Sequence, residues 1–544
     1  MDFWRKKMLV TKAEEMRNLD RETIEVLGIP GIVLMENAAR GVTSVIYDKL
    51  NGNSVVVICG KGNNGGDGLA IARNLYNLGY DVEVVLTAKI EELKGDARIN
   101  AEILSKLPVP LHVVKEESKL LELYSLLKEA DFIIDAIFGT GLSKPAEGFY
   151  KDLIEVINKA NKPVVSVDIP SGLSSDTGEI IGAHIIADIT VTFGFPKLAH
   201  IMPPACYYVG ELFVVDISIP EDVSSLVTSK RYILTLDEVA FTFPVREIMS
   251  HKYTYGHVAV IGGSAGKTGA PSMTAQSALR AGAGLSTVVV PASLNTVFEI
   301  KLTEAMSIPI PDAEKGHFGI DTIDEVVETV EKGKFSAVVI GPGLGNEPET
   351  FEFAREFIRK TTKPLIIDAD GINALAENTD ILKMKEQNII ITPHIGEFSR
   401  LTGLSKEEIL KEPYEIAKEF AEEFGVTVIL KSGRTVIATP NGKVYINVIG
   451  NPGMATAGTG DVLSGILGAF LGMGIEMEDA AKLGVFLHSL AGDIAAEELS
   501  QESLKACDII DFLPKAIKRI KEKELNLEKH KLPFVTNLRE IIGV

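Results

Sequence analysis

The chain has 544 residues, of which 46% are hydrophobic and 24% charged, so it is globular and too long for one ordinary domain. Its formal net charge of −20 argues against a nucleic-acid partner, because DNA and RNA favour basic surfaces. Any anionic ligand must therefore be held by local main-chain dipoles and a few cations. We expect two domains, residues 1–225 and 226–544, with the junction inside the proline-containing stretch 218–252.

The cysteines and the apolar runs bear on the location of the protein. Cys59, Cys206 and Cys507 are far apart and lack metal-ligand spacing, which is typical of reduced thiols in a cytoplasmic protein. The run Val462–Ile475 is too short and too glycine-rich to cross a membrane, and it predicts a buried core helix. We expect a cytoplasmic protein without a membrane or nucleic-acid partner, and we further expect a homo-oligomer.

The first half alternates strand-like runs with helical stretches. Strands are predicted at Ser54–Cys59, Asp81–Leu86, Phe132–Ile137, Pro163–Asp168 and Asp188–Phe193, and helices at Gly68–Leu78, Gly95–Leu107 and Gly148–Asn161. This alternation is typical of a Rossmann-like fold with an open, helix-covered, largely parallel sheet. Ligands bind such sheets outside the carboxyl ends of the strands. We therefore expect the loops Gly60–Asp67, Gly139–Leu142 and Asp168–Gly172 to cluster at one edge.

The loop Gly60–Asp67 is rich in glycine and contains two adjacent asparagines. Glycine lets main-chain N–H groups approach an anion closely, and the start of a helix adds partial positive charge. Taken alone, Asn63-Asn64 could be a left-handed turn, and Asp135 and Asp168 could be capping residues at strand ends. The combination indicates a ligand site more strongly than any one of these residues.

In order and spacing, these motifs resemble the NAD(P)H-hydrate epimerases over about Met8–Ile219. The resemblance implies that the hydrated dinucleotide contacts Asn63, Asn64, Gly65, Gly66, Asp67, Gly139, Thr140, Gly141, Leu142, Ser143, Lys144, Pro145 and Asp168. It also implies a potassium ion at Asn64, Asp135 and Ser171.

The substrate of such an enzyme is a hemiaminal, with a hydroxyl on a carbon next to nitrogen. The nitrogen can expel the hydroxyl, and water can return to either face of the planar centre. A carboxyl group that donates and accepts a proton in turn would assist both steps. We nominate Asp168 for this role, because it ends a strand beside the expected site.

The second half contains another alternating series. Strands are predicted within His257–Ser264 and at Gly284–Val290, Ala337–Ile340, Pro364–Asp368, Asn388–Thr392 and Val426–Leu430. Three polar segments follow strands, namely Gly341–Gly345, Thr392–Arg400 and Lys431–Thr435, and a fourth, Gly450–Asp461, opens a helix. A carboxylate at a helix start is stabilised in its ionised form, so Asp461 is a candidate general base.

Each of these features also has a plain structural interpretation. Gly341–Gly345 alone is more often a turn, and His394 alone is as often a structural hydrogen-bonding residue as a ligand. Arg434 alone would be a solvated surface charge, and Asp461 alone could be a helix cap. Their order and flanking residues together favour a functional site.

The second half resembles the ribokinase-like superfamily and, within it, the ADP/ATP-dependent NAD(P)H-hydrate dehydratases over about Tyr232–Ile520. The resemblance implies an α/β sandwich whose substrate contacts are Ala270, Gly343, His394, Ile395, Gly396, Glu397, Phe398, Ser399, Arg400 and Asp461. It places the nucleotide at Lys431, Ser432, Gly433, Arg434, Thr435, Asn451, Pro452, Gly453, Met454, Ala455, Thr456, Ala457, Gly458, Thr459 and Gly460. One departure is Lys267-Thr268 before Gly269-Ala270, where the family often has a tyrosine.

The two resemblances together imply a bifunctional enzyme that repairs hydrated NADH and NADPH. Asp461 would deprotonate the C6 hydroxyl, which attacks the terminal phosphate of ADP or ATP with Mg²⁺, and phosphate would then be eliminated. The alternative is a small-molecule kinase fused to a non-catalytic dinucleotide-binding module. The sequence leaves the choices between ADP and ATP and between NADH and NADPH open.

Overall fold

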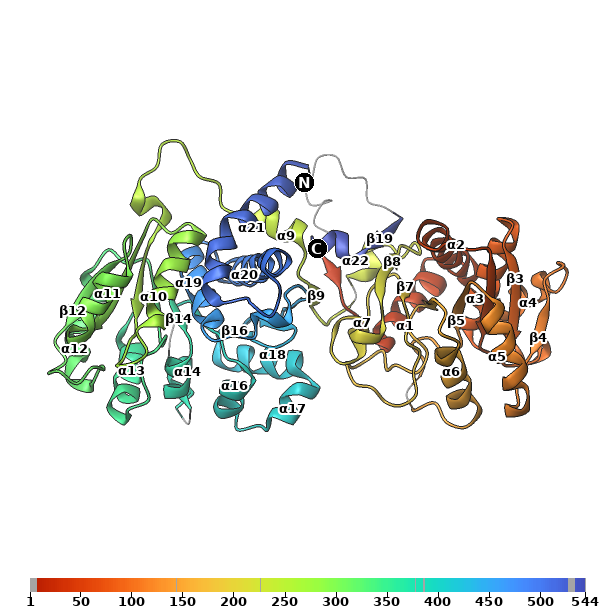
Figure 1. Cartoon of the computed structure of the whole chain (residues 1–544), viewed down its shortest axis with the longest axis horizontal. Helices are drawn as coiled ribbons and strands as arrows, with labels where there is room; N and C mark the ends of the chain where they lie inside the picture. Colours follow the sequence, from red (N-terminus) through yellow and green to blue (C-terminus); the bar gives the residue numbers. More distant parts are fainter. Residues whose placement is uncertain are drawn as a thin grey trace. The chain divides into compact units, whose positions relative to one another are not determined.

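The computed structural model describes residues 7–142, 144–225, 227–376, 378–384, 387–526 and 534–543. These residues form two compact units, each of which can be followed in Figure 1. The N-terminal unit contains residues 8–230 and 534–543, and the C-terminal unit contains Lys7 and residues 231–526. The units thus differ from a simple division at 225/226, because the last described segment lies in the N-terminal unit.

The N-terminal unit contains a sheet in the order β19-β8-β7-β6-β5-β2-β3-β4. All neighbours are parallel except the pair β19 and β8. The central strands are buried along nearly their whole length, as expected when helices cover both faces. The strands are β2 (Ser54–Cys59), β3 (Asp81–Leu86), β4 (Leu111–Val113), β5 (Phe132–Ala136), β6 (Val164–Val167), β7 (Ile189–Phe193), β8 (Glu211–Val215) and β19 (Val535–Asn537).

The three helices predicted in this unit are present, although the one after the glycine-rich loop begins earlier than expected. The helix predicted from Gly68 begins at Asn63, so the asparagines and glycines form its first turn. A Cβ atom on Gly65 would lie 1.9 Å from the carbonyl oxygen of Gly60, so only glycine lets this turn pack so closely. The helices are α1 (Ala13–Arg21), α2 (Gly31–Lys49), α3 (Asn63–Asn77), α4 (Gly95–Leu104), α5 (Leu120–Glu129), α6 (Phe149–Ala160), α7 (Leu198–Ile201), α8 (Glu221–Ser224) and α22 (Leu538–Ile542).

The sheet of the C-terminal unit runs β9-β18-β17-β16-β15-β14-β13-β10-β11-β12. It is parallel except for the antiparallel pairs β16–β17 and β17–β18. The strands are β9 (Arg231–Ile233), β10 (His257–Ile261), β11 (Leu285–Pro291), β12 (Met306–Ile310), β13 (Ala337–Ile340), β14 (Leu365–Ile367), β15 (Ile389–Ile391), β16 (Thr427–Leu430), β17 (Thr435–Ala438) and β18 (Val444–Asn447).

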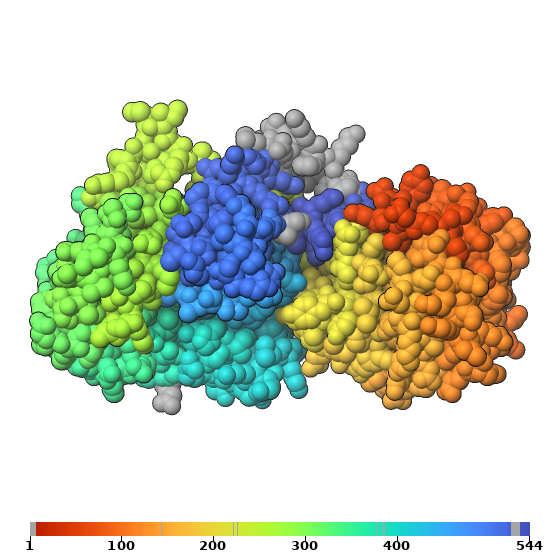
Figure 2. All heavy atoms as spheres, viewed as in Figure 1, coloured from red at the N-terminus to blue at the C-terminus, as the bar shows by residue number. Residues whose placement is uncertain are grey.

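Helices pack against this sheet, and the predicted core helix is among them. It is α19 (Thr459–Gly472), which begins within the second glycine-rich loop and is buried from Val462 to Gly472. In Figure 2, residues 477–526 (blue) form part of the visible face of this unit. The other helices are α9 (Leu236–Thr242), α10 (Gly269–Ala281), α11 (Asn295–Lys301), α12 (Ile323–Lys332), α13 (Pro348–Lys360), α14 (Asp370–Leu375), α15 (Asp380–Lys383), α16 (Ile395–Thr402), α17 (Lys406–Lys411), α18 (Pro413–Phe424), α20 (Met477–Leu499) and α21 (Ala506–Asn526). Within the described ranges, no helix has the length and apolarity needed to span a membrane.

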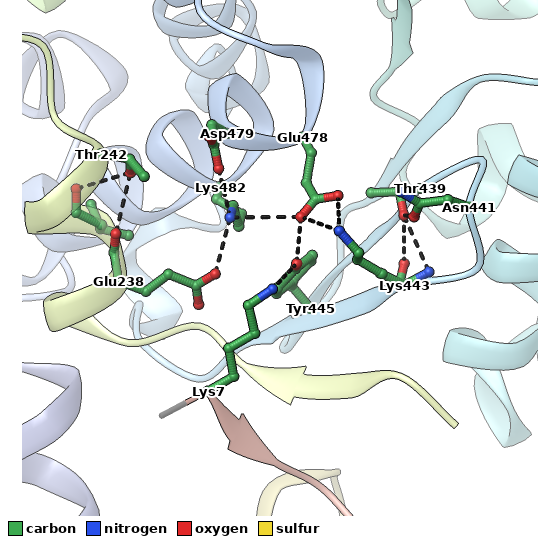
Figure 3. Close-up of polar contacts among 11 residues, drawn as sticks. Lys7, Glu238, Thr242, Thr439, Asn441, Lys443, Tyr445, Glu478, Asp479 and Lys482 are labelled. Atoms are coloured by element: carbon green, nitrogen blue, oxygen red, sulfur yellow. Dashed lines mark hydrogen bonds and ion pairs between the residues drawn. The ribbon is translucent and has the colours of Figure 1, made fainter. Parts of the chain in front are cut away.

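A polar network on β18 and α20 holds Lys7 in the C-terminal unit (Figure 3). The Lys7 Nζ donates to the hydroxyl of Tyr445 at 3.2 Å, and that hydroxyl donates to Glu478 at 2.6 Å. Lys482 is buried and forms ion pairs with Glu238 at 3.0 Å and with Glu478 at 3.8 Å. Because the charges are mutually paired, this network has a structural role.

Two candidate active sites

Asp135 and Ser171, two predicted ligands of a potassium ion, are in direct contact in the N-terminal unit. Both the N–H and the hydroxyl of Ser171 donate to the Asp135 carboxylate, at 2.8 and 2.6 Å, and the Ser166 hydroxyl donates at 2.9 Å. Burial raises the pKa of Asp135, while the hydrogen bonds from Ser171 oppose the shift. The buried carboxylate therefore has hydrogen-bond partners.

Asn64, the third predicted ligand, lies in the first turn of α3 and is nearly buried. Its amide nitrogen has no hydrogen-bond partner among the described residues. A Cβ atom on Gly139 would lie 3.3 Å from the Asn64 Oδ1, so the loop after β5 passes directly against this amide. The loop residues Gly139–Leu142, Lys144 and Pro145 are exposed or partly exposed, and the predicted contact Ser143 lies outside the described residues.

Asp168, the nominated acid–base group, forms a buried ion pair that the sequence analysis missed. The Lys197 Nζ lies 2.6 Å from the Asp168 Oδ1 and also donates to Thr192 Oγ1 at 2.8 Å and to Phe193 O at 3.1 Å. Lys197 is only 1% exposed, so all its donors are used inside the protein. Burial acts to raise the pKa of Asp168, but the charge of Lys197 and the hydrogen bonds from Lys197 and Thr192 together leave the pKa below its ordinary value.

Asp67, another predicted substrate contact, has a pKa that is shifted in the opposite direction from that of Asp168. Burial, followed by the negative charge of Asp168, raises the pKa of Asp67 well above its ordinary value. Burial also raises the pKa of nearby Asp20 to about 6, although Lys197 opposes the shift. Two carboxyl groups whose environments separate their pKa values are suited to act as an acid and a base.

In the C-terminal unit, several predicted segments meet at one carboxylate, that of Asp368. This residue follows β14 and is 1% exposed. It accepts hydrogen bonds from Lys431 Nζ at 2.9 Å, Thr392 Oγ1 at 2.7 Å and Ser464 Oγ at 2.7 Å. Burial acts to raise the pKa of Asp368, but the Lys431 charge and the three hydrogen bonds together lower it below its ordinary value. Asp368 is therefore a paired, ionised group.

Asp461 lies in the first turn of α19, as predicted, but its ionisation differs from the expectation. Burial, followed by the charge of Asp368, raises the pKa of Asp461 to about 7, and Lys431 opposes the shift. The favourable helix start therefore does not outweigh burial and like charge here. A Cβ atom on Gly460 would lie 3.1 Å from the Lys431 Nζ, so the cation lies against this turn.

His394 caps α16, which agrees with its plain structural interpretation. Its Nδ1 accepts hydrogen bonds from the N–H groups of Gly396, at 2.9 Å, and Glu397, at 3.2 Å. The main-chain N–H of His394 donates to the Glu397 carboxylate at 2.9 Å. Burial raises the pKa of Glu397 to about 7. The His394 ring remains exposed, and the N–H of Lys431 donates to Pro393 at 2.8 Å, so this segment adjoins the Lys431 segment.

The remaining predicted contacts on α16 divide between the core and the surface. Phe398 is fully buried and packs edge to face against Phe420, with ring centroids 5.4 Å apart. Its side chain therefore supports the helix from inside and cannot reach a ligand. Arg400 is exposed and its guanidinium donates to the Asn373 Oδ1 at 2.7 and 3.0 Å. Ile395 and Ser399 are partly exposed.

The turn Gly341–Gly345 lies against the start of α10. Gly343 has φ +59°, and a Cβ atom there would lie 3.2 Å from the Cβ of Ala270, so these two predicted contacts adjoin. The N–H of Gly345 donates to Asp370 Oδ2 at 2.9 Å, and Lys267 pairs with the same oxygen at 3.2 Å. Lys267, which precedes the position of the family tyrosine, is thus part of this corner of the site.

Both predicted nucleotide-binding segments lie in connections with accessible main chain. Lys431–Arg434 joins β16 to β17, and Asn451–Gly458 precedes α19. Asp493 holds the second segment, since it accepts from the N–H of Gly450 at 2.9 Å and from the Asn451 Nδ2 at 2.8 Å. Gly458 has φ +94°, a conformation that glycine adopts without strain, immediately before the helix.

Sequence reasoning missed four charged residues that organise these sites, namely Lys197, Asp368, Asp370 and Asp493. Lys197 and Asp368 follow predicted strands, so a search for charges at carboxyl ends would have found them. Asp493 lies in the middle of α20, and no local pattern distinguishes it.

Comparisons with known proteins show which family the chain belongs to. A family model described as NAD(P)H-hydrate dehydratase matches residues 258–515, and one described as YjeF-related protein N-terminus matches residues 31–199. The bifunctional NAD(P)H-hydrate repair enzyme Nnr of Moorella thermoacetica is 42% identical over 95% of this chain and 98% of its own. That of Thermofilum pendens is 40% identical over 95% of this chain and 97% of its own.

Among solved structures, the ADP/ATP-dependent NAD(P)H-hydrate dehydratase from Bacillus subtilis, co-crystallized with ATP/Mg²⁺, is 31% identical. It matches 53% of this chain and 98% of its own, with a TM-score of 0.47. The full-length identity to the bifunctional proteins exceeds 30% and extends over both units. The chain belongs to the bifunctional NAD(P)H-hydrate repair enzymes.

Proposed function

We propose that the N-terminal unit interconverts the R and S epimers of hydrated NADH and NADPH. We propose further that the C-terminal unit dehydrates the S epimer at the expense of ADP or ATP. The observation that carries the proposal is Asp461, a carboxyl group in the first turn of α19 whose pKa is raised to about 7 by burial and by Asp368. A base with a pKa near neutral pH is suited to accept a proton from a hydroxyl.

In the dehydratase reaction, Asp461 accepts the proton of the C6 hydroxyl while the oxygen of that hydroxyl attacks the terminal phosphorus of the nucleotide. The leaving group is AMP when the nucleotide is ADP, and ADP when it is ATP. The ring nitrogen next expels phosphate from C6, and loss of a proton from C5 restores the double bond of the dihydronicotinamide. The N–H groups at the start of α19 and the Lys431 cation beside Gly460 would stabilise the charge that develops on the phosphate.

The nucleotide would be held by the segments Lys431–Thr435 and Asn451–Gly460. Their fit is supported by the accessible main chain before α19 and by the Lys431 cation against Gly460. Mg²⁺ bound with the nucleotide phosphates would neutralise negative charge during phosphoryl transfer.

In the epimerase reaction, Asp67 and Asp168 would divide the acid and base roles. Asp67, the protonated carboxyl, donates a proton to the departing hydroxyl, and Asp168, held ionised by Lys197, accepts a proton from the returning water. This assignment keeps Asp168 as a proton acceptor and adds Asp67 as the donor, so that one residue need not perform both tasks.

Asn64, Asp135 and Ser171 would hold a potassium ion beside this pair. The donor set supports the proposal, because an amide, a carboxylate and a hydroxyl offer the oxygens that a hard cation prefers. An amide nitrogen donates hydrogen bonds and does not ligate a cation, so the Asn64 Oδ1, which lies beside Gly139, would be the ligand.

A single assay separates this proposal from a kinase fused to a non-catalytic module. The protein is incubated with mixed epimers of hydrated NADH, Mg²⁺ and ADP or ATP, and the dihydronicotinamide absorbance is followed. Complete conversion requires both activities, conversion of only the S epimer shows an inactive epimerase, and no conversion favours the kinase. The expected cytoplasmic location and homo-oligomer stay predictions.

A further inference from the structure

The turn Asp368-Ala369-Asp370 after β14 contains a strained backbone conformation. Ala369 has φ +48°, a conformation that costs free energy for a residue with a Cβ atom. Such strain persists only where the surroundings hold it, and here the flanking carboxylates are both bound by parts of the site. Asp368 binds three side chains, and Asp370 binds Lys267 and the N–H of Gly345.

The three donors to Asp368 come from three different segments. Lys431 begins the first nucleotide-binding segment, and Thr392 begins the segment that leads into α16. Ser464 lies one turn after Asp461 on α19, so its hydrogen bond fixes the rotation of the turn that carries the base. One buried carboxylate therefore connects α19 with the two segments that follow β15 and β16.

We propose that Asp368 is a positioning residue of the dehydratase, which aligns Lys431 and the first turn of α19 around one acceptor. The inference rests on the proposed dehydratase function and concerns how that site is assembled. Asp368 itself is buried and paired, so it does not exchange protons with the substrate.

The charge of Asp368 gives the role a measurable signature. Asp461 faces four charged groups: Asp368, Lys431, Asp370 and Glu397. Replacing Asp368 by asparagine removes a negative charge and frees Lys431 to act on Asp461. Both changes lower the pKa of Asp461, so the rate should reach its plateau at lower pH.

The test compares Asp368→Asn with the wild type, using the S epimer, Mg²⁺ and ADP or ATP. We expect kcat to fall tenfold or more and the acid limb of the pH–rate profile to move down by roughly half a unit or more. The thermal unfolding transition of the C-terminal unit, compared with that of the wild type, reports whether the variant is folded. Unchanged kcat, or a fall in kcat without movement of the limb, would overturn the inference. Because Glu397 also has a pKa of about 7, Glu397→Gln tests which residue causes the acid limb. The limb must persist in this variant if it reports the titration of Asp461.

Ser464→Ala keeps the charge and provides a second test if Asp368→Asn does not fold. Because Ser464 aligns the helix that carries the base, we expect kcat to fall while the KM for the nucleotide stays within about twofold. The matched control is Ser336→Ala. The Ser336 hydroxyl accepts a hydrogen bond from the main-chain N–H of His257, at the start of β10 and β13, whereas the site lies beyond the ends of the strands. Equal kinetics of the two serine variants would contradict the proposal. A wild type without dehydratase activity would instead refute the proposed function on which it rests.

Discussion

Asp461 combines accessibility for a substrate with an environment that keeps its carboxyl group basic. Its side chain is only partly buried, yet burial and Asp368 raise its pKa to about 7. We predict that Asp461→Asn lowers dehydratase turnover by about a hundredfold or more, because an amide cannot accept the hydroxyl proton. Calorimetric titration should show that the nucleotide still binds.

The wild-type dehydratase rate should rise with pH through about 7, since the base acts in its ionised form. The epimerase activity of Asp461→Asn should equal that of the wild type. Near-normal dehydration by this variant would remove Asp461 from the mechanism.

Asp67 and Asp168 provide a second residue-scale prediction. Asp168→Asn and Asp67→Asn should each slow equilibration of the two epimers by about a hundredfold, because each removes one proton-transfer group. Lys197→Met should also slow it, since the variant leaves Asp168 buried without its cation and raises the pKa of Asp168. Chromatographic separation of the epimers measures the rate.

The direction of the pH dependence distinguishes the two roles. Activity should be lost as pH rises through the elevated pKa of Asp67, because the acid must be protonated, and as pH falls through the lowered pKa of Asp168. Dehydration of the pure S epimer is the control for each variant. If Asp67→Asn equilibrates the epimers at the wild-type rate, the proton comes from elsewhere.

At the scale of elements, the first turn of α3 depends on small residues. A Cβ atom on Gly65 would lie 1.9 Å from Gly60 O, whereas one on Gly62 would have no heavy atom within 4 Å. We predict that Gly65→Ala destabilises the N-terminal unit by about 1–3 kcal/mol or more, because the backbone must move to admit the methyl group. Gly62→Ala should change the unfolding midpoint little. Thermal denaturation compares the two, and equal midpoints would show that α3 can shift freely.

The sequence was sufficient for the central strands of both sheets and for most of the motifs that follow them. β2 and β3 are confirmed to the residue, because buried parallel strands are continuous apolar runs bounded by polar turns. The hairpin β17–β18 was missed, although Asn441-Gly442 in its turn is a common hairpin signal. There the short strands lack a long apolar run.

The sites were predicted less completely than the elements, because pairing across the fold has no local signature. Lys197 is separated from Asp168 by a whole strand, and Asp368 from Lys431 by five helices and two strands. The ionisation states of the site carboxyl groups were harder still to predict, since burial and neighbouring charges set their pKa values. The raised pKa of Asp461, where the helix start suggested the opposite, is an example.

At the scale of the whole molecule, the chain completes its first unit with its last described strand. β19 pairs antiparallel with β8, and the Asn537 Nδ2 donates to Glu211 at 2.6 Å. We predict that ending the chain at residue 526 lowers the temperature at which epimerase activity is lost, because the β8 edge becomes unpaired. Dehydratase activity should be retained to the wild-type temperature. Loss of both activities together, or of neither, would contradict this prediction.

The position of β19 has a consequence for synthesis on the ribosome. Residues 54–215 contain the parallel strands of the N-terminal unit, so most of its sheet emerges early. The partner of β8 emerges only after the C-terminal unit has been translated. Until then, the β8 edge can pair with any extended segment, including that of another nascent chain. The N-terminal unit can thus begin to fold first, yet it cannot complete its sheet until nearly the whole chain has been translated.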